Sequence, residues 1–125
     1  MNLNITYDSN TQSSAPSAFF SAVNYVASLF DATFTNNATI NIEIGYGNFP
    51  FDGSTVQPLA ESMQNNLVFA SYSQVRQSLL GEGAPGATTL PDSSPLNGGL
   101  VLGSAEERAL GLIGASNALD GWVWV

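Results

Sequence analysis

Acidic side chains dominate the groups in this sequence that could do acid-base chemistry. The chain has 125 residues, with ten Asp or Glu, two Arg, and no His, Lys or Cys. A serine nucleophile therefore has no conventional base, and a thiolate nucleophile or a Cys-ligated metal is excluded. We expect this chain not to be an enzyme on its own.

The carboxylates do not form a convincing catalytic pair. Glu106 and Glu107 are adjacent at the start of an expected helix, so they do not face each other, and they suit helix capping and the helix dipole. The run from Asp52 to Ser54 reads Asp-Gly-Ser, which is not the Asp-Thr/Ser-Gly order of aspartic proteases. No catalytic residue is predicted.

Calcium is the most plausible ligand for the oxygen-rich segments. Asp8 and Asn10 alternate with other polar residues, and Asp92 precedes two serines in a long loop. Ser13, however, stands where an EF-hand loop needs glycine, and no Glu occupies the twelfth position. Turn chemistry explains both clusters better, because Asp, Asn and Ser bond their own backbone. We expect no cofactor, with calcium at Asp8, Asn10 or Asp92 as the weak alternative.

The net charge of −8 limits the partners. Nucleic acid and anionic membrane surfaces are disfavoured, because both are bound through clustered Lys and Arg. No apolar stretch is long enough to cross a membrane, and the first residues lack the basic and apolar regions of a signal peptide. The composition, rich in Asn, Ser, Thr and Gly, suggests an extracellular protein, secreted without an N-terminal signal peptide in this sequence.

Residues 1–125 are predicted to form a single domain. Alternating apolar residues indicate strands at 3–7 and 39–46, and residues 16–34 carry one apolar stripe at helical spacing. We expect Ser14 to cap that helix. Further strands are expected at 67–72, 100–102 and 120–125, with short helices at 74–80, capped by Ser73, and from 104 to about 112, begun by a Ser104–Glu107 capping box.

This order of elements predicts an α/β (α+β) fold. A single mixed sheet of four to five strands would be covered by one long helix and two short ones. The opening strand-helix-strand run favours a right-handed crossover with parallel pairing. The loop from Gly81 to Gly98 is rich in Pro and Gly, and long loops of this kind are usually functional or disordered.

Several segments together resemble one family. Residues 4–8, 15–19 at the start of the long helix, 39–47, 71–74, 105–112 and 120–123 are similar to the N-terminal half of secreted bacterial zincin-like (metzincin-type) metalloproteases. The resemblance covers nearly the whole chain. It implies the fold of the N-terminal zincin subdomain, with residues 120–123 as the strand that precedes the catalytic helix.

The family's activity lies outside this sequence. The resemblance implies a following helix with a His-Glu motif, in which His binds zinc and Glu is the general base. This chain has no His, so no catalytic residue is carried over. The family also binds substrate peptides along an edge strand, which the resemblance would place here near Leu100 to Leu102.

The last strand is a candidate interface. Trp122 and Trp124 share one face, and Val123 and Val125 share the other. Such a strand is either buried at the centre of the sheet or open to pairing with another chain. If no helix covers the sheet, apolar surface is left for a partner. The predicted interface residues are Trp122, Val123, Trp124, Val125, Leu100, Val101 and Leu102.

Three functions remain in competition. The first-ranked is a non-catalytic extracellular structural protein that self-assembles into a homo-oligomer or filament, or takes a protein partner by strand addition. The second is the N-terminal, substrate-edge subdomain of a secreted zinc metalloprotease, separated from its catalytic half. The third is a glycan- or peptide-binding module assisted by calcium.

Overall fold

The computed structural model describes residues 1–47 and 59–125. Its centre is a four-stranded mixed sheet in the order β1-β2-β6-β3, and a separate two-stranded ribbon pairs β4 with β5. The predicted α+β class with one mixed sheet is confirmed. The run from Asp52 to Ser54 lies outside the described residues.

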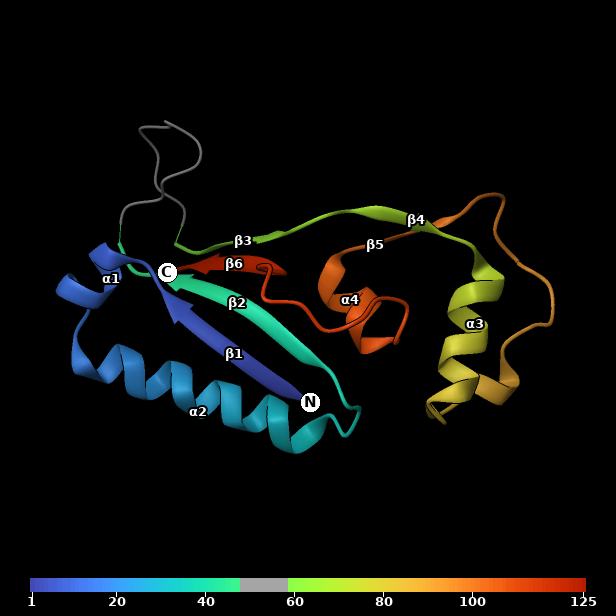
Figure 1. The fold of residues 1–125 in the computed structure, drawn as a ribbon, viewed down its shortest axis with the longest axis horizontal. Helices are drawn as coiled ribbons and strands as arrows, with labels where there is room; N and C mark the ends of the chain where they lie inside the picture. Colours follow the sequence, from blue (N-terminus) through green and yellow to red (C-terminus); the bar gives the residue numbers. More distant parts are fainter. Residues whose placement is uncertain (48–58) are drawn as a thin grey trace.

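The first half of the chain builds one edge of the sheet and its covering helix. Strand β1 (Asn2–Tyr7) pairs in parallel with β2 (Thr39–Gly45), as the strand-helix-strand order predicted. The helix α2 (Ser17–Thr33) connects them and lies along β1 (Figure 1). Phe19 and Phe20 of α2 meet the ring of Tyr7 edge-on, with ring centroids 6.3 and 5.0 Å apart.

Two local predictions at this end were wrong. The polar run after β1 forms a short helix, α1 (Ser9–Ser14), because the Asp8 carboxylate accepts a hydrogen bond from the Thr11 backbone N–H at 3.0 Å. The long helix begins after Pro16, and Ser14 instead donates its hydroxyl to the Asn10 carbonyl at 2.7 Å inside α1.

The sheet is completed by strands that come much later in the chain. Strand β6 (Gly121–Trp124) lies between β2, to which it is parallel, and β3 (Glu61–Gln64), to which it is antiparallel. The sequence did not predict β3, because its single apolar residue, Met63, gives no alternating pattern. One consequence is that β3, and not β6, forms the second edge of the sheet.

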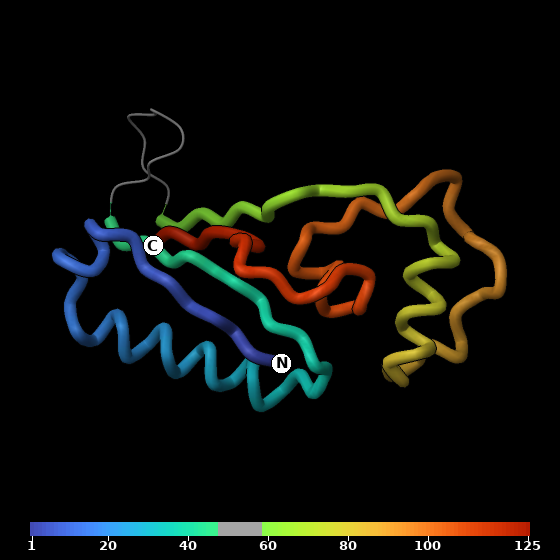
Figure 2. The backbone as a smooth tube through the Cα atoms, viewed as in Figure 1, coloured from blue at the N-terminus to red at the C-terminus, as the bar shows by residue number. Residues whose placement is uncertain are grey.

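Part of the chain extends away from the sheet in a long arm (Figure 2). Strand β4 (Val68–Ala70) continues the line of β3 and pairs antiparallel with β5 (Leu100–Leu102). The arm carries α3 (Tyr72–Gly81) and the short 3-10 helix η1 (Ala87–Thr89), and the chain returns through β5 to α4 (Ser104–Ala109), which contacts β2.

The predicted caps of α3 and α4 are both displaced from their expected residues. The cap of α3 is Ser71, whose hydroxyl accepts from the Gln74 N–H while the Gln74 side chain accepts from the Ser71 N–H. At α4 the capping carboxylate is Glu106, which accepts from the Gly103 N–H at 2.7 Å. In each case the cap lies earlier because the helix starts earlier.

Candidate functional site

The main concave feature of the described structure is an apolar groove between α2 and the sheet. It has a volume of about 710 Å³. The helix α2 forms one wall, and strands β1, β2 and β6 form the other. We call it the apolar groove, and its lining includes Val26, Phe30, Phe34, Ile40, Ile42 and Val123.

The side chains that line the groove are partly exposed. Phe34 stacks on Phe30 with ring centroids 5.8 Å apart, yet Val26, Phe30 and Phe34 are 45–49% exposed. No residue of α2 is fully buried. Large apolar side chains at helical spacing normally form a core. In this chain the apolar side chains of α2 face the sheet but remain partly exposed to solvent.

The groove carries almost no charge. Glu106 is the one charged side chain in its lining among the described residues, and its carboxylate is already bonded to the Gly103 N–H. An apolar segment entering the groove would therefore leave no ionised group unpaired. The groove suits the face of an amphipathic helix better than a polar ligand.

The open edge at β3 is the second feature. Asn65 directs its backbone toward the interior, donating its N–H to the Asp120 carbonyl at 2.9 Å and accepting from the Ser104 N–H at 3.1 Å. Since backbone groups alternate along a strand, Ser62 and Gln64 direct theirs away from β6. An extended peptide could therefore pair with this edge.

The edge expected near Leu100 to Leu102 is not part of the main sheet. Strand β5 pairs with β4 in the separate ribbon, where Val101 lies opposite Phe69. The resemblance placed the edge at β5, and the sequence did not predict β3. The edge of the main sheet on this side is Glu61–Gln64.

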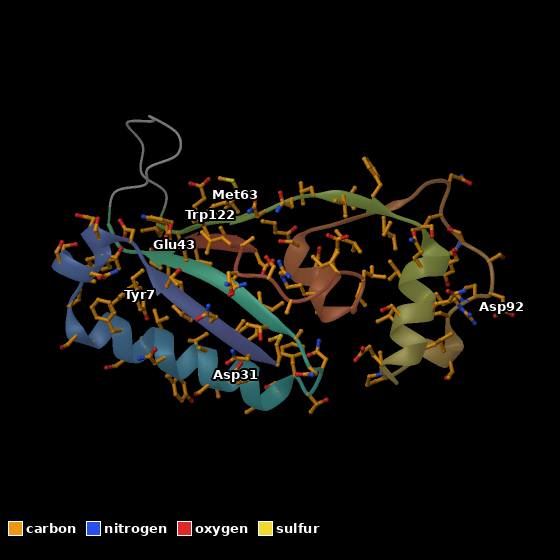
Figure 3. All side chains as sticks on the ribbon, in the orientation of Figure 1. Tyr7, Asp31, Glu43, Met63, Asp92 and Trp122 are labelled. Carbon is orange, nitrogen blue, oxygen red and sulfur yellow. The ribbon has the colours of Figure 1, made fainter. Side chains whose placement is uncertain are left out.

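The terminal strand is enclosed on both sides. Both edges of β6 are occupied, so β6 itself is not open to pairing with another chain, and that part of the interface prediction was wrong. The side chains of β6 alternate between the two faces of the sheet, as the sequence predicted. Val123 and Val125 line the groove, whereas Trp122 lies on the opposite face in a row with Glu43 and Met63 (Figure 3).

A buried polar cluster anchors the end of the sheet where β6 begins. Asp120 is fully buried, and its two carboxylate oxygens accept from the Arg108 Nε at 2.9 and 3.1 Å and from the Asn41 N–H at 2.9 Å. Arg108 also donates to the Gly114 carbonyl. The Asn41 side chain donates to the Ser116 and Ala118 carbonyls at 2.8 and 3.0 Å. We call these residues the polar hub.

Opposing effects set the pKa of Asp120. Burial raises the pKa of this carboxyl, but the hydrogen bond from the Asn41 N–H and the hydrogen bonds and charge of Arg108 outweigh burial and hold it below its ordinary value. Asp120 is therefore ionised at neutral pH. Its role is structural, because every partner it has is part of the fold.

The sequence pattern does not predict the polar hub. The signal that was present is Arg108 itself, one of two basic residues, which follows Glu106 and Glu107 in a short helix and is followed by apolar and glycine residues. A basic side chain in such a segment is normally paired when it is buried. Its partner, 12 positions away, could not be read from local spacing.

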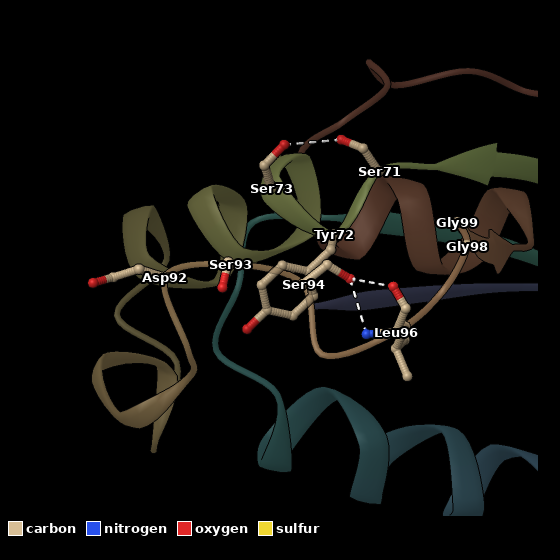
Figure 4. Close-up of a pocket in the computed structure, with 9 residues that line it drawn as sticks. All are labelled: Ser71, Tyr72, Ser73, Asp92, Ser93, Ser94, Leu96, Gly98 and Gly99. Carbon is tan, nitrogen blue, oxygen red and sulfur yellow. Dashed lines mark hydrogen bonds between the residues drawn. The ribbon is translucent and has the colours of Figure 1, made fainter.

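The second pocket is a hydroxyl-lined cleft of about 420 Å³ at the start of α3 (Figure 4). Its polar groups largely bond one another, as Ser71 does with Ser73 at 3.1 Å and Ser94 with the Leu96 backbone at 3.1 Å. Asp92 is 97% exposed, and its carboxylate pairs with Arg76 at 2.6 Å. Nothing here converges on a ligand.

The weak calcium candidates are separate and already engaged. Asp8 caps α1, and Asp92 is paired with Arg76 in the distant arm. No group of three or more acidic side chains able to hold a metal occurs among residues 1–47 and 59–125. We expect millimolar calcium to leave the melting temperature unchanged in a thermal scan, because only a ligand of the folded state raises it. A calcium-dependent rise would restore the third candidate function.

Comparisons with protein-family models, with curated proteins and with solved structures found no match. None of the helices in the described part of the chain has the length and apolar character needed to cross a membrane.

Proposed function

We propose that this chain is the non-catalytic, substrate-edge half of a zincin-like secreted metalloprotease, and that a helix from outside these residues fills the apolar groove. The observation that carries the proposal is the groove itself. It is apolar, nearly free of charge, and bounded by the strand that the resemblance aligns with the one before the catalytic helix. Polypeptide continuing from β6 would enter it directly, since Val123 and Val125 line it.

In the proposed half-domain, the open edge of β3 would bind the substrate. A substrate peptide would pair with Ser62 and Gln64, whose backbone groups are directed away from β6. The catalytic groups would come from the helix, because the described residues include no metal-binding cluster. In this arrangement the chain holds the substrate and the helix supplies the zinc and the general base.

The decisive test is the coding sequence downstream of Val125 and the protein that it encodes. The proposal expects a helical segment with a His-Glu motif. The extended protein should cleave peptides in a zinc-dependent manner and should bind a hydrophobic dye such as ANS less than the 125-residue chain. A stop codon directly after Val125, or an extension without that motif, would overturn the proposal.

Val26 and Tyr25, which are neighbours on α2, allow a matched pair of substitutions that tests the proposal in the extended protein. Val26 lines the groove and is 49% exposed, whereas Tyr25 is 64% exposed and lies outside it. In the extended protein we expect Val26→Asp to cost about 3 kcal/mol or more, because the carboxylate would be buried without a partner. Tyr25→Asp should change the free energy of unfolding by less than about 0.5 kcal/mol, as surface substitutions usually do. Urea unfolding measures both, and equal effects would mean that no helix occupies the groove.

Self-association is the second candidate function. The observation that favours it is an exposed apolar surface on the ribbon of β4 and β5, in a part of the chain that carries no charge. Solution size by light scattering tests it. A chain that stays monomeric at high concentration would remove this candidate and leave the half-domain proposal standing.

A further inference from the structure

The two outer strands of the main sheet present different edges. At β1, the Leu3 N–H donates to the Asp31 carboxylate at 2.9 Å, and the Tyr7 carbonyl accepts from the Gln12 side chain at 2.7 Å. Side chains of the chain itself therefore occupy both ends of this edge, which is how proteins protect an outer strand from pairing. At β3, no side chain of the described residues bonds the outward backbone groups, so strand addition is directed to β3.

The glutamates of the main sheet lie on one of its two faces. Glu43 is opposite Trp122 across β2 and β6, and Glu61 is opposite Trp124 across β3 and β6. Both therefore lie on the face that points away from the apolar groove (Figure 3). Met63 of β3 shares this face and is 42% exposed. A strand added at β3 would place every second side chain on this face, directly beside Glu61 and Met63.

The chain has no basic side chain left to neutralise Glu61. It contains two, of which Arg76 is paired with Asp92 and Arg108 with Asp120. Opposite charges directly across two strands stabilise their pairing, and like charges destabilise it. The net charge of −8 also attracts a basic peptide and repels an acidic one as either approaches. A basic strand is therefore the partner that this edge favours.

We propose that the β3 edge binds a basic peptide segment by strand addition, with a Lys or Arg beside Glu61 and an apolar side chain beside Met63. The two peptide residues are two positions apart, because alternate residues of a strand share a face. Glu61 and Met63 are then the residues that determine specificity. The inference rests on the proposed function, because it names the class of peptide that the half-domain would hold for cleavage.

The charge preference is tested by the binding of two labelled peptides to the 125-residue chain, followed by fluorescence anisotropy. One peptide is Ser-Lys-Ser-Leu-Ser-Lys-Ser, and the other has Glu in place of each Lys. We expect the Lys peptide to bind about tenfold more tightly or better. Glu61→Lys should reverse this preference. Glu82→Lys, an exposed position at the end of α3 in the arm, changes the net charge equally and should keep most of it.

Two results would overturn the charge preference. If Glu61→Lys and Glu82→Lys reduce the preference equally, the peptide responds to the overall charge of the chain and not to the β3 edge. If neither peptide binds at millimolar concentration, the edge does not take a strand of this class.

Backbone methylation of the Lys peptide tests strand addition separately from charge. Only alternate N–H groups of an added strand face β3, so methylating one alternate set removes donors to the edge and methylating the other set does not. We expect one methylated peptide to lose at least about tenfold in affinity and the other to bind like the parent. Equal affinity of the two methylated peptides would overturn strand addition.

The extended protein separates this inference from the proposed function. Zinc-dependent cleavage with no preference between the Lys and Glu peptides would overturn the inference and leave the proposed function standing. Binding of the Lys peptide that Glu61→Lys reverses, in a protein whose downstream sequence lacks the His-Glu motif, would leave a peptide-binding edge standing and overturn the proposed function.

Discussion

Replacing Asp120 with alanine is expected to lower the free energy of unfolding by about 3–5 kcal/mol, because it leaves the Arg108 guanidinium buried without its partner. The Asp120 side chain has no exposed surface and that of Arg108 is 6% exposed. The substitution also removes the acceptor for the Asn41 N–H, which lies inside β2. A buried donor left unpaired adds to the cost. Urea or thermal unfolding measures the loss.

The chain contains its own control for this prediction. Arg76 and Asp92 form the other ion pair of the described structure, and the Asp92 side chain is almost fully exposed. Asp92→Ala should cost less than about 1 kcal/mol, because solvent screens a surface pair. Replacing both members of the buried ion pair, as in Arg108→Met with Asp120→Leu, should be less damaging than Asp120→Ala alone. If Asp120→Ala and Asp92→Ala have equal effects, the polar hub does not hold the fold together.

The same carboxylate predicts how stability depends on pH. The folded-state pKa of Asp120 lies below its ordinary value of about 3.9. The stabilising contribution is therefore complete above the unfolded-state pKa and is lost as pH falls through the folded-state pKa. Urea unfolding at a series of pH values below about 5 should show a steeper loss for the native chain than for Asp120→Ala.

Gly45→Ala is the second substitution with a large expected effect. Gly45 ends β2 opposite Trp124, and a β-carbon at this position would lie inside the indole ring. The ring itself is buried, with Trp124 only 5% exposed, so it cannot move aside freely. We expect a loss of about 3 kcal/mol or more, at the upper end of overpacking effects. Tryptophan fluorescence during unfolding should report the change, because Trp124 is one of two tryptophans.

Gly114→Ala is the matched control, since a β-carbon there meets no atom within 4 Å. It should leave stability within about 0.5 kcal/mol. Adding Trp124→Leu to Gly45→Ala should recover part of the loss by removing the ring that clashes. If Gly45→Ala unfolds at the same denaturant concentration as the native chain, Trp124 does not pack over Gly45.

The parts of the fold that follow a strong local pattern were predictable. Residues 39–45 alternate isoleucine with polar residues, and residues 17–33 place apolar groups at helical spacing, so both elements were identified with their pairing. Helix caps were misplaced by a few residues, because several serines near a helix start can each serve, as Ser71 and Ser73 show.

The parts that depend on distant residues were not predictable. Strand β3 has no alternating apolar pattern and exists because β6 offers it a partner. The polar hub unites Asn41, Arg108 and Asp120, and the Asn4 side chain joins it by donating to Asn41 at 2.9 Å. Such contacts are set by the tertiary fold, and single-sequence patterns report only the local part of it.

The position of β6 has a consequence for folding during synthesis. This strand follows every other strand of its sheet along the chain, yet it lies between β2 and β3. As the chain leaves the ribosome, β1, α2 and β2 can assemble early, whereas β3 and the open side of β2 must wait for β6. The nascent chain therefore carries two unpaired strand edges for most of its synthesis, at about 5–20 residues per second. Unpaired edges promote aggregation.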